Sequence, residues 1–255
     1  MSTLPFAGRT VLVTGAGLGL GRGIAHAFAA AGAAVWGCDI LAEGLAETEA
    51  GSPAALRTQV TDVTNKAQVQ AFAQAALAAT GRIDILVNDA GGLCGQSFRP
   101  LEEVSEADWH QVVNANLTSA FLCAAAVSPA MKQAGFGRIV NIASGAGLTT
   151  TVTGIQAYAS AKAGMIGLTR QLAQELGPFG ITVNSVAPGA IPCNPYGAGK
   201  WEALGAEGQR VALERLAMRK VGRPADIANA VLFFAGEDNG WVTGQTLLID
   251  GGRRV

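Results

Sequence analysis

The sequence predicts a doubly wound α/β fold, in which a seven-stranded parallel sheet has helices on both faces. Two observations predict it. Short apolar runs rich in β-branched residues alternate with longer alanine-rich helical patterns along the chain, as they do in strand-helix-strand units. Each run is continuously apolar, which is typical of strands buried on both faces of a parallel sheet. The expected strands are residues 10–15, 33–40, 56–63, 83–91, 137–144, 181–189 and 245–250.

Helical patterns fill most of the segments between these strands. Helices that connect successive parallel strands cover both faces of the sheet, as in a Rossmann-like fold. No composition shift, repeat or low-complexity tract divides the chain, so residues 1–255 are expected to form a single domain. The expected helices lie near residues 19–31, 42–50, 65–80, 105–132, 155–177 and 224–235.

One long segment, about residues 191–208, lacks a regular pattern, because prolines and glycines interrupt it. It follows the carboxyl end of the sixth expected strand, and open α/β sheets bind their ligands at that edge. We interpret it as a lid over a substrate.

The composition argues against several classes of partner. The chain has 18 basic and 19 acidic residues without a basic cluster, which disfavours nucleic acid and anionic membranes. Apolar stretches such as residues 24–38 are shorter than the roughly 18 uninterrupted residues of a membrane span. The start, MSTLPFAGRT, does not resemble a secretory leader, so a cytoplasmic protein is expected. Four scattered cysteines and two distant histidines predict neither a metal site nor a disulfide framework.

A glycine-rich segment joins the first expected strand to the first expected helix. Residues 14–21 read T-G-x-x-x-G-x-G, with Thr14, Gly15, Gly19 and Gly21 at the fixed positions. Glycines there let a phosphate approach backbone N–H groups and the positive end of the helix. The loop alone is also compatible with a structural turn.

Asp39 ends the second expected strand, about 20 residues beyond the glycine loop. A carboxylate there accepts hydrogen bonds from a ribose 2′-hydroxyl and repels a 2′-phosphate. Leu18, Cys38 and Ile40 supply no positive charge nearby, which favours NAD over NADP. The alternative interpretation is an aspartate that caps a turn.

Further motifs follow in chain order: N-D-A-G at 88–91, Ser144 after the fifth expected strand, and Tyr158-x-x-x-Lys162 in GIQAYASAKAGM. Alone, the tyrosine and lysine are more typical of an ordinary helical turn. Together with the glycine loop, these motifs make the chain resemble the short-chain dehydrogenase/reductase family, from about residue 6 to the closing DGG at 250–252.

The resemblance implies four catalytic residues. Tyr158 would be the general acid/base, and Lys162 would lower its pKa and hold the nicotinamide ribose. Ser144 would bind the substrate oxygen, and Asn116 would support a water chain to the lysine. The chemistry is consistent, because an unperturbed tyrosine titrates near ~10 and needs a nearby cation to act as a base at neutral pH.

The resemblance also implies a cofactor site, with Asp62 against the adenine and residues 188–191 at the nicotinamide end. The expected cofactor residues are Gly15, Gly17, Leu18, Gly19, Leu20, Gly21, Asp39, Ile40, Asp62, Val63, Asn88, Ala90, Gly91, Tyr158, Lys162, Pro188, Gly189 and Ile191.

Three features depart from the family pattern. Asp89 replaces an amide that helps to tie the central strands together, and a buried carboxylate must find donors or protonate. Cys193 stands where a threonine that contacts the nicotinamide is common. The interval from Ser144 to Tyr158 is 14 residues, one more than usual. Either the loop absorbs the extra residue or Ser144 is displaced.

The leading hypothesis is an NAD-dependent dehydrogenase for a secondary alcohol, such as a sugar, sugar acid or polyol. The loops expected around the substrate are rich in hydroxyl and amide groups, although loops are polar in general. Arg99 is expected to meet a substrate carboxylate, with Arg253 or Arg254 reaching in from a neighbouring subunit. The expected substrate residues are Gln96, Arg99, Ser144, Thr149, Gln156 and Tyr158.

Two alternatives stay open: a 3-oxoacyl-thioester reductase and a non-catalytic dinucleotide sensor. A sensor has no need of a tyrosine, lysine, serine and asparagine together. From the resemblance, the long helices at 105–132 and 155–177 are expected to pack between subunits of a homotetramer.

Overall fold

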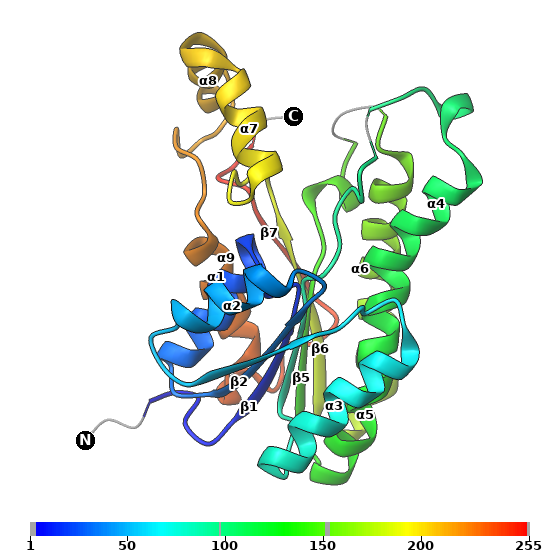
Figure 1. Ribbon diagram of the computed structural model, residues 1–255, viewed down its shortest axis with the longest axis vertical. Coiled ribbons are helices and arrows are strands. Elements are labelled where there is room, and N and C mark those ends of the chain that lie inside the picture. Colours follow the sequence, from blue (N-terminus) through cyan, green and yellow to red (C-terminus); the bar gives the residue numbers. More distant parts are fainter. Residues whose placement is uncertain (1–3, 97, 151–153, 254–255) are drawn as a thin grey trace.

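The computed structural model describes residues 4–96, 98–150 and 154–253 (Figure 1). Its centre is a seven-stranded sheet in the order β3-β2-β1-β4-β5-β6-β7, and every neighbouring pair is parallel. The expected seven-stranded parallel sheet is confirmed. The strands are β1 (Thr10–Thr14), β2 (Ala34–Asp39), β3 (Leu56–Val60), β4 (Ile85–Asn88), β5 (Gly137–Ile142), β6 (Ile181–Pro188) and β7 (Thr246–Ile249).

Helices cover both faces of this sheet (Figure 1). One apolar core lies under α1 and α9 and includes Phe28 and Ile227, whereas another lies under α3 and α5 and includes Phe72 and Met131. The helices that match the expected windows are α1 (Gly19–Ala30), α2 (Ala42–Ala50), α3 (Lys66–Thr80), α4 (Glu106–Val113), α5 (Ser119–Ala134), α6 (Gln156–Leu176) and α9 (Pro224–Ala235). Short 3-10 turns are η1 (Leu101–Glu103), η3 (Gly145–Gly147), η4 (Gly177–Phe179) and η5 (Glu237–Asn239).

The helix expected at 105–132 is interrupted by a π-helical turn, η2 (Asn114–Thr118), between α4 and α5. Such turns often occur at functional sites, and this one contains the buried Asn116. Residues 106–134 are long and apolar enough to cross a membrane by length and mean hydropathy. In this fold α5 packs against β4, β5 and α3 and buries Cys123, Val127 and Met131, while Phe121 of the same helix is exposed.

The expected irregular segment at 191–208 is largely helical, so that part of the prediction was wrong. Asn194 accepts a hydrogen bond from the Gly197 N–H (2.8 Å), and Pro195 occupies the first turn. Together they start α7 (Pro195–Ala203), and Gly205 separates it from α8 (Gly205–Glu214). Both helices project beyond the carboxyl edge of the sheet (Figure 1).

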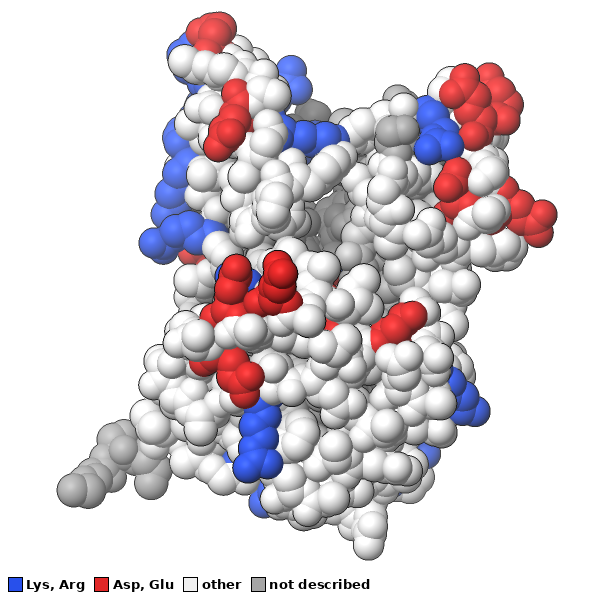
Figure 2. Space-filling model, viewed as in Figure 1, with Lys and Arg blue, Asp and Glu red and all other residues white. Residues whose placement is uncertain are grey.

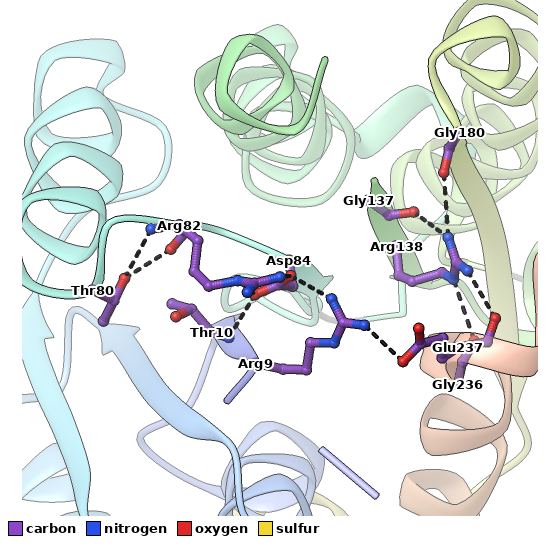
Figure 3. A network of polar contacts seen from close by, with 10 residues as sticks. All are labelled: Arg9, Thr10, Thr80, Arg82, Asp84, Gly137, Arg138, Gly180, Gly236 and Glu237. Atoms are coloured by element: carbon purple, nitrogen blue, oxygen red, sulfur yellow. Dashed lines mark hydrogen bonds and ion pairs between the residues drawn. The ribbon is translucent and has the colours of Figure 1, made fainter. Parts of the chain in front are cut away.

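A polar network joins strands β1, β4 and β5 at the opposite edge of the sheet (Figure 3). The buried Asp84 carboxylate accepts hydrogen bonds from Arg9 (3.0 Å), Arg82 (2.7 Å) and the Thr10 N–H (2.9 Å). Arg138 donates to main-chain carbonyls of four residues, Gly137, Gly180, Gly236 and Glu237. The network therefore joins the starts of the central strands to the turn that follows α9.

Candidate active site

The loop from β1 to α1 has the form of a phosphate site. Leu18 gives α1 no side-chain cap, and its first turn carries no acidic residue, so the positive end of the helix is available to an anion. A Cβ on Gly21 would lie 2.1 Å from the Gly15 carbonyl oxygen, and one on Gly15 would lie 2.8 Å from the Ala90 nitrogen. Glycine is therefore required for this close packing, and Gly15 and Gly19 also have positive φ (70° and 59°). These residues fit a dinucleotide pyrophosphate.

Asp39 lies against this loop from the end of β2. Its carboxylate accepts hydrogen bonds from the Gly17 N–H (3.0 Å) and the Leu41 N–H (3.1 Å). The sequence interpretation overlooked Arg22, a basic side chain at the start of α1. Arg22 forms an ion pair with Glu47 (2.8 Å), so its charge is already balanced. The Asp39 carboxylate can therefore still accept hydrogen bonds from a ribose bound at this position.

The remaining residues of the expected adenosine side lie next to Asp39. Thr61 follows β3 and donates its N–H to the Asp39 carbonyl oxygen (2.9 Å), which places Asp62 and Val63 beside the end of β2. Val63 is buried, whereas Ile40 is exposed. The structure therefore brings these predicted residues together.

The N-D-A-G segment shows which residue ties the central strands. The Asn88 amide donates to Asn141 Oδ1 (2.9 Å) on β5, and the Asn141 amide donates to Thr169 Oγ1 (2.9 Å) on α6. The expectation that residue 89 makes this tie was wrong. Asp89 and Ala90 instead use their N–H groups to bind Thr14 Oγ1, each at 3.1 Å.

The Asp89 carboxylate lies on the first turn of α1 and not between strands. A Cβ on Gly21 would lie 2.8 Å from its Oδ2. Burial raises the pKa of Asp89 to about 7, although the Lys162 charge and the Gly21 N–H oppose that rise. Asp89 is therefore a half-buried acid at the junction of the glycine loop and Lys162.

Asn116 holds the loop that follows β4. Its Oδ1 accepts from the Gly92 N–H (2.9 Å), and its Nδ2 donates to the Gly92 and Val112 carbonyl oxygens (both 2.8 Å). A Cβ on Gly91 would lie 2.4 Å from Asn116 Oδ1. The amide thus positions Gly91 beside the site, while the implied water chain stays a prediction.

The Tyr158 hydroxyl, the Ser144 hydroxyl and Lys162 meet where β5 ends and α6 begins. Ser144 lies close enough to the Tyr158 hydroxyl to oppose the rise of its pKa, and the Ser144 Oγ accepts a hydrogen bond from the Ala146 N–H (3.2 Å). Lys162 is buried, and its Nζ donates to the Ile142 carbonyl oxygen (2.7 Å) and lies 5.8 Å from the centre of the Tyr158 ring.

Burial shifts the pKa values of Tyr158 and Lys162. It raises the pKa of Tyr158 although Ser144 opposes the rise, and Asp89 raises it further. Burial also lowers the pKa of Lys162 to about 8, against the opposing charge of Asp89. The ammonium of Lys162 donates to the Ile142 carbonyl oxygen, and the lowering of the Tyr158 pKa by Lys162 stays a prediction.

The expected nicotinamide end lies where β6 ends. After Pro188, the Gly189 N–H donates to the Ile249 carbonyl oxygen (2.9 Å), and Ile191 packs against the first core. The Cys193 Sγ lies 3.5 Å from the position of a Cβ on Gly19. The Leu20 N–H also points to this thiol, and burial raises the pKa of Cys193. A thiol therefore adjoins the start of α1 at this position.

The predicted substrate residues have different surroundings. Gln96 is buried, and neither its Nε2 nor its Oε1 has a hydrogen-bond partner among the described residues. Gln156 donates to the Arg99 carbonyl oxygen (3.1 Å), while its own Oε1 lacks a partner in the same set of residues. Thr149 is exposed. Arg99 forms an ion pair with Asp108 (3.0 Å), and its contact with a substrate carboxylate stays a prediction.

Three basic residues late in the chain complete the comparison with the sequence predictions. Arg253 forms an antiparallel bridge with Leu216, whereas Arg254 lies outside the described residues. The sequence interpretation assigned no role to Lys200, whose Nζ lies 3.9 Å from the centre of the Phe98 ring. Only the folded chain brings these two residues together, and no local pattern could have indicated their contact.

A hollow separates α7 and α8 from the side of the molecule that carries α4 (Figure 2). It lies at the carboxyl edge of the sheet, above β1, β4, β5 and β6 (Figure 1). The glycine loop, Ser144 and Tyr158 all follow strands or begin helices at this edge. Open α/β sheets bind ligands in such a position.

Comparison with known proteins identifies the class. Residues 15–254 match the family model described as Enoyl-(Acyl carrier protein) reductase. The chain is 45% identical over 250 residues to (2S)-((R)-hydroxy(phenyl)methyl)succinyl-CoA dehydrogenase subunit BbsD of Thauera aromatica, covering 97% of each chain. It is 39% identical over 252 residues to D-threitol dehydrogenase of Mycolicibacterium smegmatis, covering 97% of this chain and 94% of that one. The crystal structure of levodione reductase has a TM-score of 0.89 at 35% identity, covering 96% of this chain and 97% of the other.

The fold and these matches define an oxidoreductase that acts on hydroxyl or keto groups with a nicotinamide dinucleotide. The chain belongs to the short-chain dehydrogenase/reductase family.

Proposed function

We propose that the protein is an NAD-dependent dehydrogenase that interconverts a secondary alcohol and its ketone. The observation that carries the choice of NAD is the Asp39 carboxylate, held against the glycine loop by the Gly17 and Leu41 N–H groups. A 2′-phosphate there would meet a negative charge, while the nearby Arg22 is already paired with Glu47. A 2′-hydroxyl would instead donate to the carboxylate.

Tyr158 is the proposed proton-transfer group. The bound nicotinamide accepts or supplies the hydride, and the protein's residues handle the proton. In ketone reduction the Tyr158 hydroxyl donates its proton to the carbonyl oxygen, while Ser144 stabilises that oxygen by a hydrogen bond. In alcohol oxidation the phenolate takes the hydroxyl proton. Because the pKa of Tyr158 is raised, oxidation is expected to become faster as the pH increases.

Lys162 and Asn116 support this step from either side. Lys162 is proposed to hydrogen-bond to the nicotinamide ribose. Its ammonium must then donate to the ribose and to the Ile142 carbonyl oxygen at the same time. An ammonium has three donors, so both contacts are compatible. Asn116 keeps Gly91 and Gly92 in place beside the site.

The proposed substrate carries several oxygen groups, as a sugar, sugar acid or polyol does. Three buried amide atoms support this choice, because Gln96 Nε2, Gln96 Oε1 and Gln156 Oε1 lack partners in the part of the chain that the structure describes. Buried polar atoms are normally satisfied, and substrate hydroxyls would supply what these atoms lack. One relative, at 39% identity, is a D-threitol dehydrogenase.

A hydroxyacyl thioester is the second candidate substrate. The relative at 45% identity, subunit BbsD, is named as a dehydrogenase of (2S)-((R)-hydroxy(phenyl)methyl)succinyl-CoA. Another, from Thermotoga maritima, is a 3-oxoacyl-(acyl-carrier-protein) reductase at 36% identity over 248 residues, covering 96% of this chain and 97% of that one. Both are named for acyl-thioester chemistry.

A substrate screen tests the proposal directly. Purified protein is mixed with NAD or NADP and with sugars, sugar acids, polyols or hydroxyacyl thioesters, and the absorbance of the reduced cofactor is followed. We expect turnover with NAD and at least one secondary alcohol. Tyr158→Phe should reduce kcat by at least about 100-fold while NADH affinity stays within about twofold. Full activity of that variant would exclude the assigned role of Tyr158.

The proposal also covers the oligomeric state of the protein and the segment above its substrate site. We infer a cytoplasmic homotetramer, supported by the exposed Phe121 on α5 and Trp109 on α4, because oligomers commonly bury such apolar side chains. Light scattering after size exclusion measures the mass directly, and a monomer would contradict the inference. Residues 191–208 are proposed to cover the substrate as a helical lid, extended by the rest of α8.

A further inference from the structure

Lys200 lies against two aromatic rings on opposite sides of the hollow. Its Nζ is 3.9 Å from the centre of the Phe98 ring and 4.5 Å from the centre of the Tyr196 ring. Phe98 belongs to the loop that follows β4, whereas Tyr196 and Lys200 belong to α7. The lysine therefore connects the lid to the facing loop.

The positive charge of Lys200 is not neutralised. None of the ion pairs formed by the described residues includes it. Aromatic faces attract a cation but carry no net charge, so they hold the ammonium without cancelling it. Arg99 is also basic and lies on the facing loop, but Asp108 balances its charge at 3.0 Å.

The charge is accessible to a ligand. Phe98 is 48% exposed and Tyr196 is 53% exposed, and Lys200 is itself exposed. Basic side chains stand on both sides of the hollow at its upper rim (Figure 2). A carboxylate or phosphate attracts an ammonium more strongly than an aromatic ring does, so an anionic ligand beside α7 can bind Lys200 in place of these rings.

We propose that Lys200 is a specificity-determining residue that selects substrates with a negative group at a distance from the reacting carbon. This inference rests on the proposed dehydrogenase function and names the substrate class of the same site. The anion can be a carboxylate of the substrate itself, as in a sugar acid, or a phosphate of a thioester carrier. The carboxylate fits the oxygen-rich substrate proposed above.

The test compares ketones that carry a negative group with neutral derivatives of the same keto acids. Calorimetry measures their binding to the enzyme saturated with NAD, a complex in which a ketone cannot be reduced. The first probes are 4-oxopentanoate and 5-oxohexanoate, each with its neutral methyl ester. The second pair is 3-oxobutanoyl-CoA and the neutral N-acetylcysteamine thioester of the same acid.

Four proteins are compared: wild type, Lys200→Met, Lys200→Arg and the control Lys132→Met. The control removes a similar contact, because Lys132 Nζ lies 4.6 Å from the centre of the Phe179 ring at the end of α5, away from the hollow. An exposed ion pair contributes up to about a fivefold change in affinity. We expect Lys200→Met to weaken anionic probes by about that factor and to leave neutral probes unchanged. Lys200→Arg and Lys132→Met should bind as wild type does.

Each outcome decides the proposal. If only the keto acids bind more tightly than their neutral partners, the group that Lys200 recognises is the carboxylate. If only the CoA ester does so, the group is the phosphate of the carrier. If Lys200→Met weakens the affinity for charged and neutral probes equally, the lysine has only a structural role and the proposal is overturned. A wild type that binds no anionic probe more tightly than its neutral partner would overturn it too. Failure of every alcohol in the turnover screen concerns the dehydrogenase function and leaves this binding comparison intact.

Discussion

Replacing Asp89 with asparagine is expected to stabilise the protein increasingly as the pH rises from 5 to 7. Burial moves the pKa of this carboxyl from 3.8 to about 7 in the folded state. Between these values the unfolded chain carries an ionised Asp89 while the folded chain keeps it protonated. The favourable effect of the neutral acid is therefore complete below about pH 4 and is lost as the pH approaches 7. Asparagine has the same shape and never ionises.

The magnitude follows from that pKa difference. One pH unit corresponds to 1.36 kcal/mol, so the full displacement is equivalent to about 4 kcal/mol. Between pH 5 and pH 7 the free energy of unfolding of Asp89→Asn should rise by about 2 kcal/mol relative to wild type, because the proton uptake of the folded state falls to half as the pH reaches 7. Lys162 stays largely protonated in this range, because its pKa is about 8. Because the Asp89 charge raises the pKa of Lys162, its removal lowers the lysine pKa, which adds to the same rise in stability with pH.

Urea unfolding at half-unit pH intervals, followed by circular dichroism, measures this difference. Asp238→Asn is the matched control, because Asp238 is exposed and its replacement should give a curve parallel to that of wild type. If the Asp89→Asn and wild-type curves also run parallel from pH 5 to pH 7, the carboxyl is not protonated in the folded protein. The account of Asp89 as a half-buried acid beside Lys162 would then be wrong.

Three further substitutions test the remaining features. Asp39→Ser should reduce the preference for NADH over NADPH by about tenfold in fluorescence titrations, because it removes the charge that repels a 2′-phosphate; an unchanged ratio would contradict the choice of NAD. Asp84→Ala should lower the free energy of unfolding by about 3 kcal/mol, since it leaves two arginines and a buried N–H without their acceptor; a loss below about 1 kcal/mol would show that the network contributes little. Gly21→Ala should weaken NADH binding at least tenfold, because its Cβ would lie 2.1 Å from a carbonyl oxygen. Gly167→Ala is its control, with nothing within 4 Å of the new Cβ, and should stabilise α6 by about 0.5–1 kcal/mol.

Some features could be predicted from the sequence because they depend on neighbours in the chain. The alternation of apolar strands and helices is a local pattern, and parallel strands align their carboxyl ends at one edge. The glycine loop, Asp39, Ser144 and Tyr158 all follow strands or begin helices at that edge, so their convergence follows from strand order. The helix in 195–203 was missed because its start depends on a single cap, Asn194, within a segment rich in proline and glycine.

Other features depend on contacts between residues far apart in the chain, and the tertiary structure alone decided them. Arg99 is neutralised by Asp108, and Lys200 meets Phe98 across the hollow. The direction of the Tyr158 pKa shift also belongs here, because burial raises this pKa by more than Ser144 lowers it. The sequence by itself determined the fold class and which chemical groups gather at the carboxyl edge. Packing decided which of these groups keep a free charge or a free hydrogen-bonding atom, because neutralisation and burial are set by partners that no local pattern specifies.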